Sequence, residues 1–136
     1  MTGKAMIDTN IWVYFYSKNP QNKYLIAQKL VSDRFDSIII SSQVLGELYH
    51  VLTRKNLTSQ EEAKQIIVEL STNFPVWAID AATVLNALEI NSNEGYSYWD
   101  SLIISAALLN NCTTLYSEDM QHDRLIAGKM RIVNPF

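Results

Sequence analysis

The chain has 136 residues, 48% hydrophobic and 18% charged, a balance that is ordinary for one folded domain. Its single cysteine excludes a disulfide framework and a cysteine-based zinc site, and it fits a reducing compartment. A formal net charge of −3, with Lys and Arg thinly spread, predicts no basic surface for tight non-specific binding of nucleic acid.

Short apolar runs alternate with amphipathic stretches from the start of the chain. A first strand is expected at residues 5–7, a brief helix at 10–16, and a longer helix over 19–31. Residues 37–41 carry the clearest strand pattern, three isoleucines bounded by serines. Ser42 is expected to cap the helix that follows, in which apolar residues recur at helical spacing.

The same alternation continues through the second half. A pattern typical of a capping box at 58–61 predicts a helix to about residue 70, and Asp80 is expected to cap a helix that ends before a break at 91–95. A further apolar helix is expected at 97–109. The remaining strands are predicted at 75–79, 113–116 and 131–133. Strands separated by helices indicate a mostly parallel sheet covered on both faces, so we expect one three-layer α/β/α domain over residues 1–136.

Four carboxylates lie in core-forming segments, where an acid is out of place. The first follows the apolar run 5–7, the last follows the strand-like run 113–116, and the other two lie in apolar helical patterns. Acids in such surroundings need a compensating positive charge, and a divalent metal is the usual source. We call this set the acidic quartet: Asp8, Glu47, Asp100 and Asp119.

The quartet could meet at one edge of the sheet, because ligands bind at the carboxyl ends of parallel strands. Like charges so close would raise one another's pKa unless a cation bound between them. Mg²⁺ and Mn²⁺ favour oxygen ligands, and two such ions about 4 Å apart can activate a water and stabilise the leaving oxygen in phosphodiester hydrolysis.

Each acid also has a purely structural interpretation. Asp8 could be a helix N-cap, and Asp119 a cap or turn residue. Asp100 could be an acid of a first helical turn, where the helix dipole favours it. Glu47 could pair with Arg54 or His50, or be solvated. Taken singly, none of the four residues identifies a site.

Five ordered motifs resemble the PIN-domain family, specifically the VapC-type toxins of bacterial toxin–antitoxin modules. They span almost the whole chain in the family's order. Two small departures are Ser101, where Ala is common, and Ser117, where Thr is common. The motifs are MIDTNI (6–11), SSQVLGEL (41–48), YWDSLIISAA (98–107), LYSEDMQH (115–122) and IVNPF (132–136).

The resemblance implies that the acidic quartet is catalytic and holds Mg²⁺ or Mn²⁺, with Thr9, Asn10 and Ser117 as supporting polar residues. It also implies an endoribonuclease that hydrolyses RNA phosphodiester bonds and is neutralised by a VapB-like antitoxin. In this family the antitoxin's tail occupies the cleft, and homodimers are common.

Two rival functions are kept. One is a non-catalytic PIN-like module that only binds protein or RNA. The other is a phosphotransfer domain with a strand-end aspartate as nucleophile. Such phosphatases require a second Asp two residues after the first, and here residue 10 is Asn.

No signal peptide or membrane span is expected, because Asp8 interrupts the N-terminal apolar stretch and no apolar run is long enough. The expected location is the cytoplasm.

Overall fold

A computed structural model describes residues 3–136. Its central sheet has the strand order β1 (Lys4–Ile7), β4 (Cys112–Tyr116), β6 (Met130–Val133), β5 (Leu125–Ile126). The first three of these strands run parallel, and β5 runs antiparallel to β6. The chain folds back between β5 and β6, so this edge of the sheet is a short hairpin.

A second pair of strands extends the sheet on the other side of β1. β2 (Ile40–Ser41) and β3 (Val76–Trp77) are parallel to each other. A parallel bridge joins Ile38 to Ala5, and the Ile39 N–H donates to the Ala5 carbonyl at 2.9 Å. The sheet is therefore mostly parallel, as the sequence predicts.

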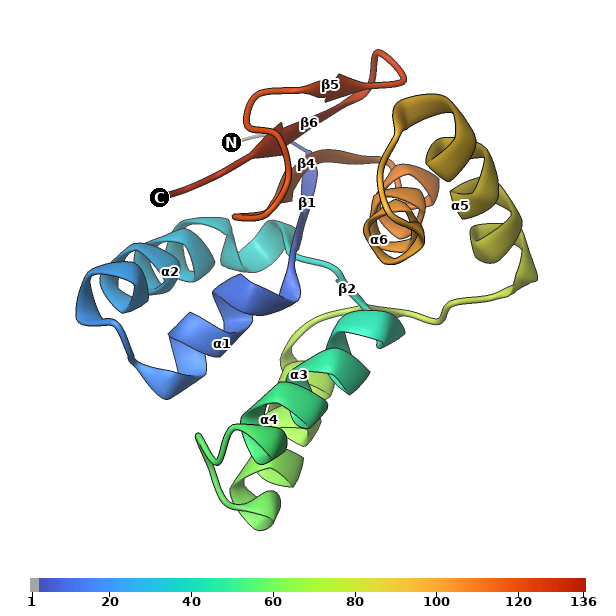
Figure 1. The fold of residues 1–136 in the computed structure, drawn as a ribbon. Coiled ribbons are helices and arrows are strands. Elements are labelled where there is room, and N and C mark those ends of the chain that lie inside the picture. Colours follow the sequence, from blue (N-terminus) through green and yellow to red (C-terminus); the bar gives the residue numbers. More distant parts are fainter. Residues whose placement is uncertain (1–2) are drawn as a thin grey trace.

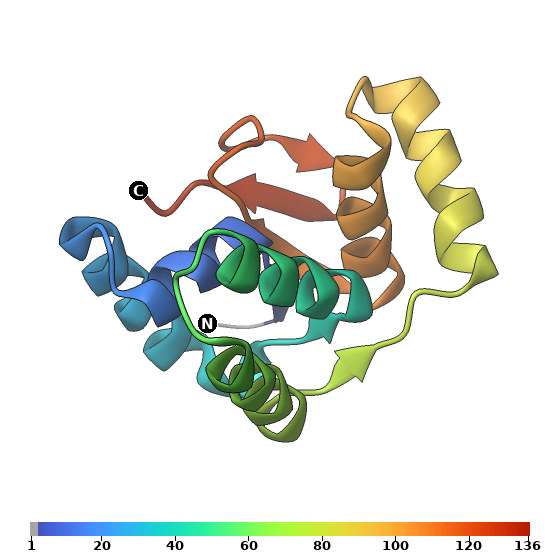
Figure 2. The ribbon, with the colours of Figure 1, turned by 60° about the horizontal axis from the view of Figure 1, so that its bottom comes forward.

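Helices cover both sides of this sheet. Figure 1 shows α1 (Thr9–Ser17) and α2 (Gln21–Arg34) on one side, and α5 (Ala81–Glu94) and α6 (Tyr98–Leu109) on the other. The turned view of Figure 2 shows the same separation. The predicted three-layer α/β/α class is thus confirmed. That residues 1–136 form a single domain stays a prediction.

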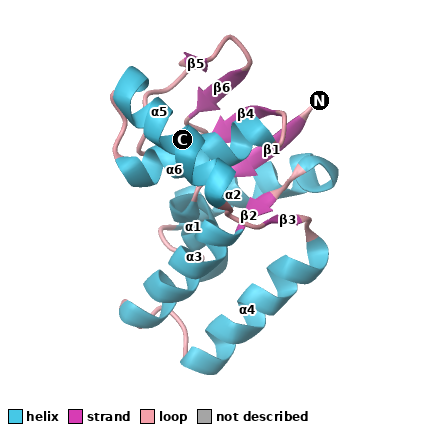
Figure 3. Cartoon of the chain, turned by 90° about the vertical axis from the view of Figure 1, so that its right-hand side faces the viewer, coloured by secondary structure: helices cyan, strands magenta, loops and turns pink. Residues whose placement is uncertain are grey.

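The remaining two helices form a projecting pair. α3 (Ser42–Arg54) and α4 (Gln60–Asn73) lie side by side and extend away from the sheet (Figure 3). Buried apolar side chains join α3 to the main core, and Leu48 and Leu52 are fully buried there. No helix within residues 3–136 is long and apolar enough to cross a membrane.

Hydrogen bonds at the helix starts explain most of the boundaries. Ser41, not the predicted Ser42, caps α3, because its backbone is extended and its hydroxyl accepts the Val44 N–H at 3.3 Å. The Ser42 hydroxyl instead accepts the Ile79 N–H at 3.0 Å and ties the helix to the segment after β3. Asp80 caps α5 as predicted, through the Thr83 N–H.

Two further expectations for local structure were wrong, and one strand was missed. The predicted strand 37–41 is only β2, because residue 37 ends a 3₁₀ turn and the segment then changes partner: the Ile39 N–H bonds to β1, whereas the Ile40 N–H bonds to Pro75. The predicted break at 91–95 is mostly helix, since α5 ends only at Gly95, which has a φ of 78°. β5 was not predicted at all.

Candidate functional site

Asp8 lies directly after β1, at the carboxyl end of the sheet. Its Oδ1 accepts the Thr9 N–H at 2.8 Å, which makes it the N-cap of α1. Its Oδ2 accepts the Ser117 hydroxyl at 2.9 Å, and Ser117 follows β4, the neighbouring parallel strand. The cap interpretation is therefore correct, and the same carboxylate also joins the ends of two strands.

Asp119 follows β4 by three residues. Its N–H donates to the Ser117 hydroxyl at 3.3 Å, and its Oδ2 accepts the Asn10 side-chain amide at 2.5 Å. Asn10 lies in the first turn of α1, so Asp119 is held beside the helix that Asp8 caps.

Glu47 reaches the same place from α3. The Thr9 hydroxyl donates to its Oε1 at 2.7 Å, and the Gln43 amide, one turn earlier on α3, donates to its Oε2 at 3.4 Å. Its hydrogen bonds thus go to Thr9 and Gln43, and not to Arg54 or His50, the partners considered from the sequence.

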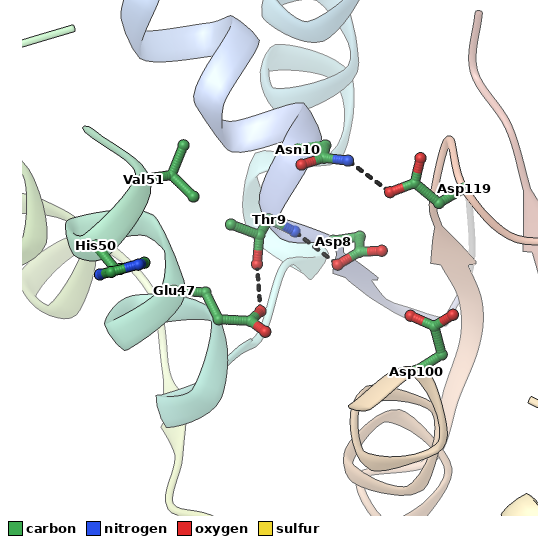
Figure 4. Close-up of a pocket in the computed structure, with 8 residues that line it drawn as sticks. All are labelled: Asp8, Thr9, Asn10, Glu47, His50, Val51, Asp100 and Asp119. Carbon is green, nitrogen blue, oxygen red and sulfur yellow. Dashed lines mark hydrogen bonds between the residues drawn. The ribbon is translucent and has the colours of Figure 1, made fainter. Parts of the chain in front are cut away.

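Asp100 approaches from the opposite side. It lies in the first turn of α6, the place the helix-dipole interpretation expects for an acid, and its backbone N–H donates to the Ser97 hydroxyl at 3.2 Å. Figure 4 shows its carboxylate on α6, across the pocket from Glu47 and Thr9.

The four carboxylates come from four different segments and line one pocket of about 290 Å³ (Figure 4). All three polar residues predicted to support the site are hydrogen-bonded to a quartet member: Thr9 to Glu47, Asn10 to Asp119 and Ser117 to Asp8. The structure therefore brings the predicted residues together, and their roles stay predictions. The pocket is lined by Asp8, Thr9, Asn10, Glu47, His50, Val51, Asp100 and Asp119.

Burial disfavours negative charge on two of the acids, Asp8 and Asp100. Burial raises the pKa of Asp8 from 3.8 to about 6, against the lowering effect of its hydrogen bonds from Thr9 and Ser117; the charges of Glu47 and Asp100 add to the rise. Burial likewise raises the pKa of Asp100, and the neighbouring quartet charges act in the same direction.

No basic side chain in the described part of the chain forms an ion pair with the quartet. The ion pairs found within residues 3–136 all lie elsewhere: Lys23–Glu118, Lys29–Asp33, Arg124–Glu94 and Arg131–Asp123. Within the described residues, no ion pair therefore offsets the charges of the quartet.

The donor set fits a hydrated divalent ion better than a fully protein-ligated one. Within residues 3–136, no three His, Cys, Asp or Glu side chains are grouped closely enough to hold one ion as they stand. Mg²⁺ typically binds one or two carboxylates and keeps several waters. The carboxylate oxygens of the quartet are donors of the kind such an ion prefers, with waters completing its shell.

Sequence reasoning did not identify two polar residues of α3, His50 and Gln43, as part of the site. His50 lines the pocket and lies three residues after Glu47, on the same face of α3. Gln43 lies four residues before Glu47, and its amide bonds both to Glu47 and to the Trp99 carbonyl at 3.2 Å, which links α3 to α6. Helical spacing from Glu47 is the signal that could have identified both.

Comparisons with known proteins identify the family and the fold of the chain. Residues 5–127 match the family model of the PIN domain. A toxin–antitoxin complex from Klebsiella pneumoniae has a chain of similar fold, with a TM-score of 0.75 and 16% identity over 98% of both chains. A chain of DNA-bound VapBC from Salmonella typhimurium has a TM-score of 0.74 and 16% sequence identity, over 99% of this chain and 100% of its own length.

VapC20 from Mycobacterium tuberculosis, a toxin that cleaves the sarcin–ricin loop, has a TM-score of 0.68 and 20% identity, over 82% of this chain and 87% of its own. No curated protein sequence matches the chain. At these identities the solved structures establish a shared fold.

Proposed function

The chain belongs to the PIN-domain family, and on that premise we propose that it is a metal-dependent endoribonuclease, the toxin of a toxin–antitoxin pair. One observation carries the proposal: four carboxylates from four segments line one pocket, and no cation in the described residues pairs with them. The similarity of fold to VapC20, a toxin that cleaves an RNA loop, supports it.

Asp8 and Asp100 are the proposed principal ligands of Mg²⁺ or Mn²⁺, because burial raises the pKa of both carboxyls and a cation would offset that cost. Asp119 and Glu47 complete the set. When bound, such an ion lowers the pKa of a coordinated water and stabilises charge on the leaving oxygen.

The residues of the chain hold these groups in place. Thr9 and Ser117 fix both oxygens of Asp8, so that carboxylate is oriented before an ion arrives. Glu47 Oε1 is held by Thr9 at 2.7 Å, while Oε2 accepts only a 3.4 Å bond from Gln43. Oε2 is therefore the atom best able to orient an attacking water or to accept its proton.

The proposed partners follow from the same charges. RNA phosphates would be repelled by the bare quartet, so substrate binding depends on the ion. A VapB-like antitoxin is the proposed inhibitor, since structures of similar fold are complexes with antitoxins; a basic side chain of its tail could replace the ion's charge. A homodimer and a cytoplasmic location complete the proposal.

Cleavage of RNA tests the proposal. Wild type should degrade RNA in Mn²⁺ and stop when EDTA is added. Asp100→Asn should lose about a hundredfold or more of that activity, because one principal ligand is gone. Glu69→Gln is the matched control, as it removes an exposed carboxylate of α4 that is remote from the pocket. Equal Mn²⁺-dependent activity in wild type and Asp100→Asn would refute the assignment.

A second candidate is the non-catalytic PIN-like binding module. It is favoured by the finding that no three potential ligands within residues 3–136 are grouped closely enough to hold one ion. A wild-type protein that binds RNA or an antitoxin, yet takes up neither Mg²⁺ nor Mn²⁺, would select this function instead.

A further inference from the structure

Three consecutive residues after β4 reach three different partners. Ser117 donates to Asp8, and Asp119, which lines the pocket, accepts from Asn10. Glu118, between them, does not line the pocket, although it adds a further acid beside the quartet. Its side chain is engaged elsewhere, and the site described above does not account for it.

Glu118 is held by two residues from two helices. The Tyr14 hydroxyl of α1 donates to its Oε1 at 2.5 Å, and the Lys23 ammonium of α2 forms an ion pair with its Oε2. Lys23 also donates to the Tyr14 hydroxyl at 3.4 Å, which closes a three-residue network. We call these residues the Tyr14–Lys23–Glu118 clamp.

The clamp is more sheltered than an ordinary surface ion pair. The side chains of Lys23 and Glu118 are 30% and 19% exposed, whereas those of the Lys29–Asp33 pair on the same helix are 77% and 55% exposed. The Lys23 ammonium also lies 4.9 Å from the ring centre of Tyr14 and 5.3 Å from that of Phe136. Reduced exposure strengthens such an interaction, since water screens it less.

The clamp and the pocket share one face of α1. Asn10 and Tyr14 are four residues apart, so their side chains lie one turn apart on the same side of the helix. They bind adjacent residues, Asp119 and Glu118. Two attachments one turn apart fix the direction of the segment after β4, which a single bond to Asp119 would leave free to turn.

We propose that the Tyr14–Lys23–Glu118 clamp positions the Asp119 carboxylate for metal binding. The inference rests on the proposed function, because it assumes that the pocket takes up a divalent ion. The three clamp residues act through Asp119 and are positioning residues. Lys23 also neutralises Glu118, so that its negative charge does not add to that of the quartet.

Calorimetric titration of the metal-free full chain with Mn²⁺ tests the clamp. Tyr14→Phe keeps the ring and its packing but removes the hydroxyl, and Glu118→Gln removes the charge. Each should weaken Mn²⁺ affinity roughly tenfold or more, as loss of an outer-shell partner does. RNA cleavage should return to near the wild-type rate at saturating Mn²⁺. Lys23→Met should behave in the same way, and Lys23→Arg should restore most of the affinity because it keeps the positive charge.

Lys29→Met is the matched control, since it breaks the exposed pair on the same helix and should leave Mn²⁺ affinity unchanged. A second readout needs no metal: amide hydrogen exchange at residues 117–119 should be faster in Tyr14→Phe than in wild type.

The outcomes separate the two proposals. If wild type binds Mn²⁺ and cleaves RNA, but the clamp variants match it in affinity and amide exchange, the clamp is overturned and the proposed function stands. If wild type binds no Mn²⁺, the proposed function fails, and with it the role given to the clamp.

Discussion

Asp8 serves two structural purposes and one proposed chemical purpose. It caps α1 and joins the ends of β1 and β4, yet burial opposes its ionisation. A residue kept only as a cap would favour a solvated carboxylate or a neutral side chain. The combination of good hydrogen bonds with an unfavourable charge is typical of functional sites.

The raised pKa of Asp8 predicts how stability changes with pH when no metal is present. Well below pH 3.8 the carboxyl is protonated in both the folded and the unfolded chain, so its burial does not lower the free energy of unfolding through charge. Between 3.8 and about 6 the unfolded chain loses the proton more readily, and the folded state loses stability as pH rises. The raised pKa of Asp100 acts in the same direction.

In EDTA, the free energy of unfolding of Asp8→Asn minus that of wild type should therefore be about 1–3 kcal/mol larger at pH 7.5 than at pH 4. Urea unfolding of both proteins at the two pH values measures this difference. A difference in unfolding free energy that does not change with pH would contradict the burial argument. Added Mn²⁺ should restore wild-type stability at pH 7.5, because the ion binds only the folded state.

At the scale of elements, local hydrogen bonds set where α4 starts. The Ser59 hydroxyl accepts the Glu62 N–H at 3.1 Å, and the Glu62 carboxylate accepts the Ser59 N–H at 3.2 Å, which completes a capping box. The sequence pattern at 58–61 predicted such a box one residue too early.

Ser59→Ala should lower the free energy of unfolding by about 1 kcal/mol, the usual cost of losing a cap. Mn²⁺ affinity should stay at the wild-type value, since α4 contributes no residue to the pocket. Denaturant unfolding checks the predicted loss of stability, and the Mn²⁺ titration checks the predicted affinity. A loss of metal affinity in Ser59→Ala would show that α4 influences the site, against the present account.

The elements that sequence predicted well are those with local signals. Helices such as α5 and α6 carry their own caps, Asp80 and Ser97, and their own apolar spacing. β2 was overestimated because its pairing depends on two strands distant in sequence. The two-residue strand β5 has no pattern of its own and exists only through its hairpin with β6.

The site was predictable to a similar extent, and for the same reason. The rule that ligands bind at strand ends places Asp8 and Asp119 together. The contacts from Thr9 to Glu47 and from Lys23 to Glu118 join residues 38 and 95 positions apart, and no local pattern indicates them. Tertiary packing alone creates these contacts, so they could not be predicted from local sequence patterns.

At the scale of the whole molecule, the distribution of charge matters more than its sum. The chain has a net charge of −3, and no Lys or Arg is among the residues described as lining the pocket. An RNA substrate would therefore meet an acidic pocket whose described lining contains no Lys or Arg. The proposed activity thus depends on a bound divalent ion for substrate binding as well as for chemistry.

A calorimetric titration with Mn²⁺ at pH 7.5 bears most directly on that dependence. Wild type, stripped of metal, should show saturable binding, because the ion offsets the cost of burying ionised carboxylates. The Asp8→Asn/Asp100→Asn double variant should bind at least about a hundredfold more weakly. Saturable binding that is equal in both proteins, or none in wild type, would contradict the assignment of the acidic quartet as a metal site.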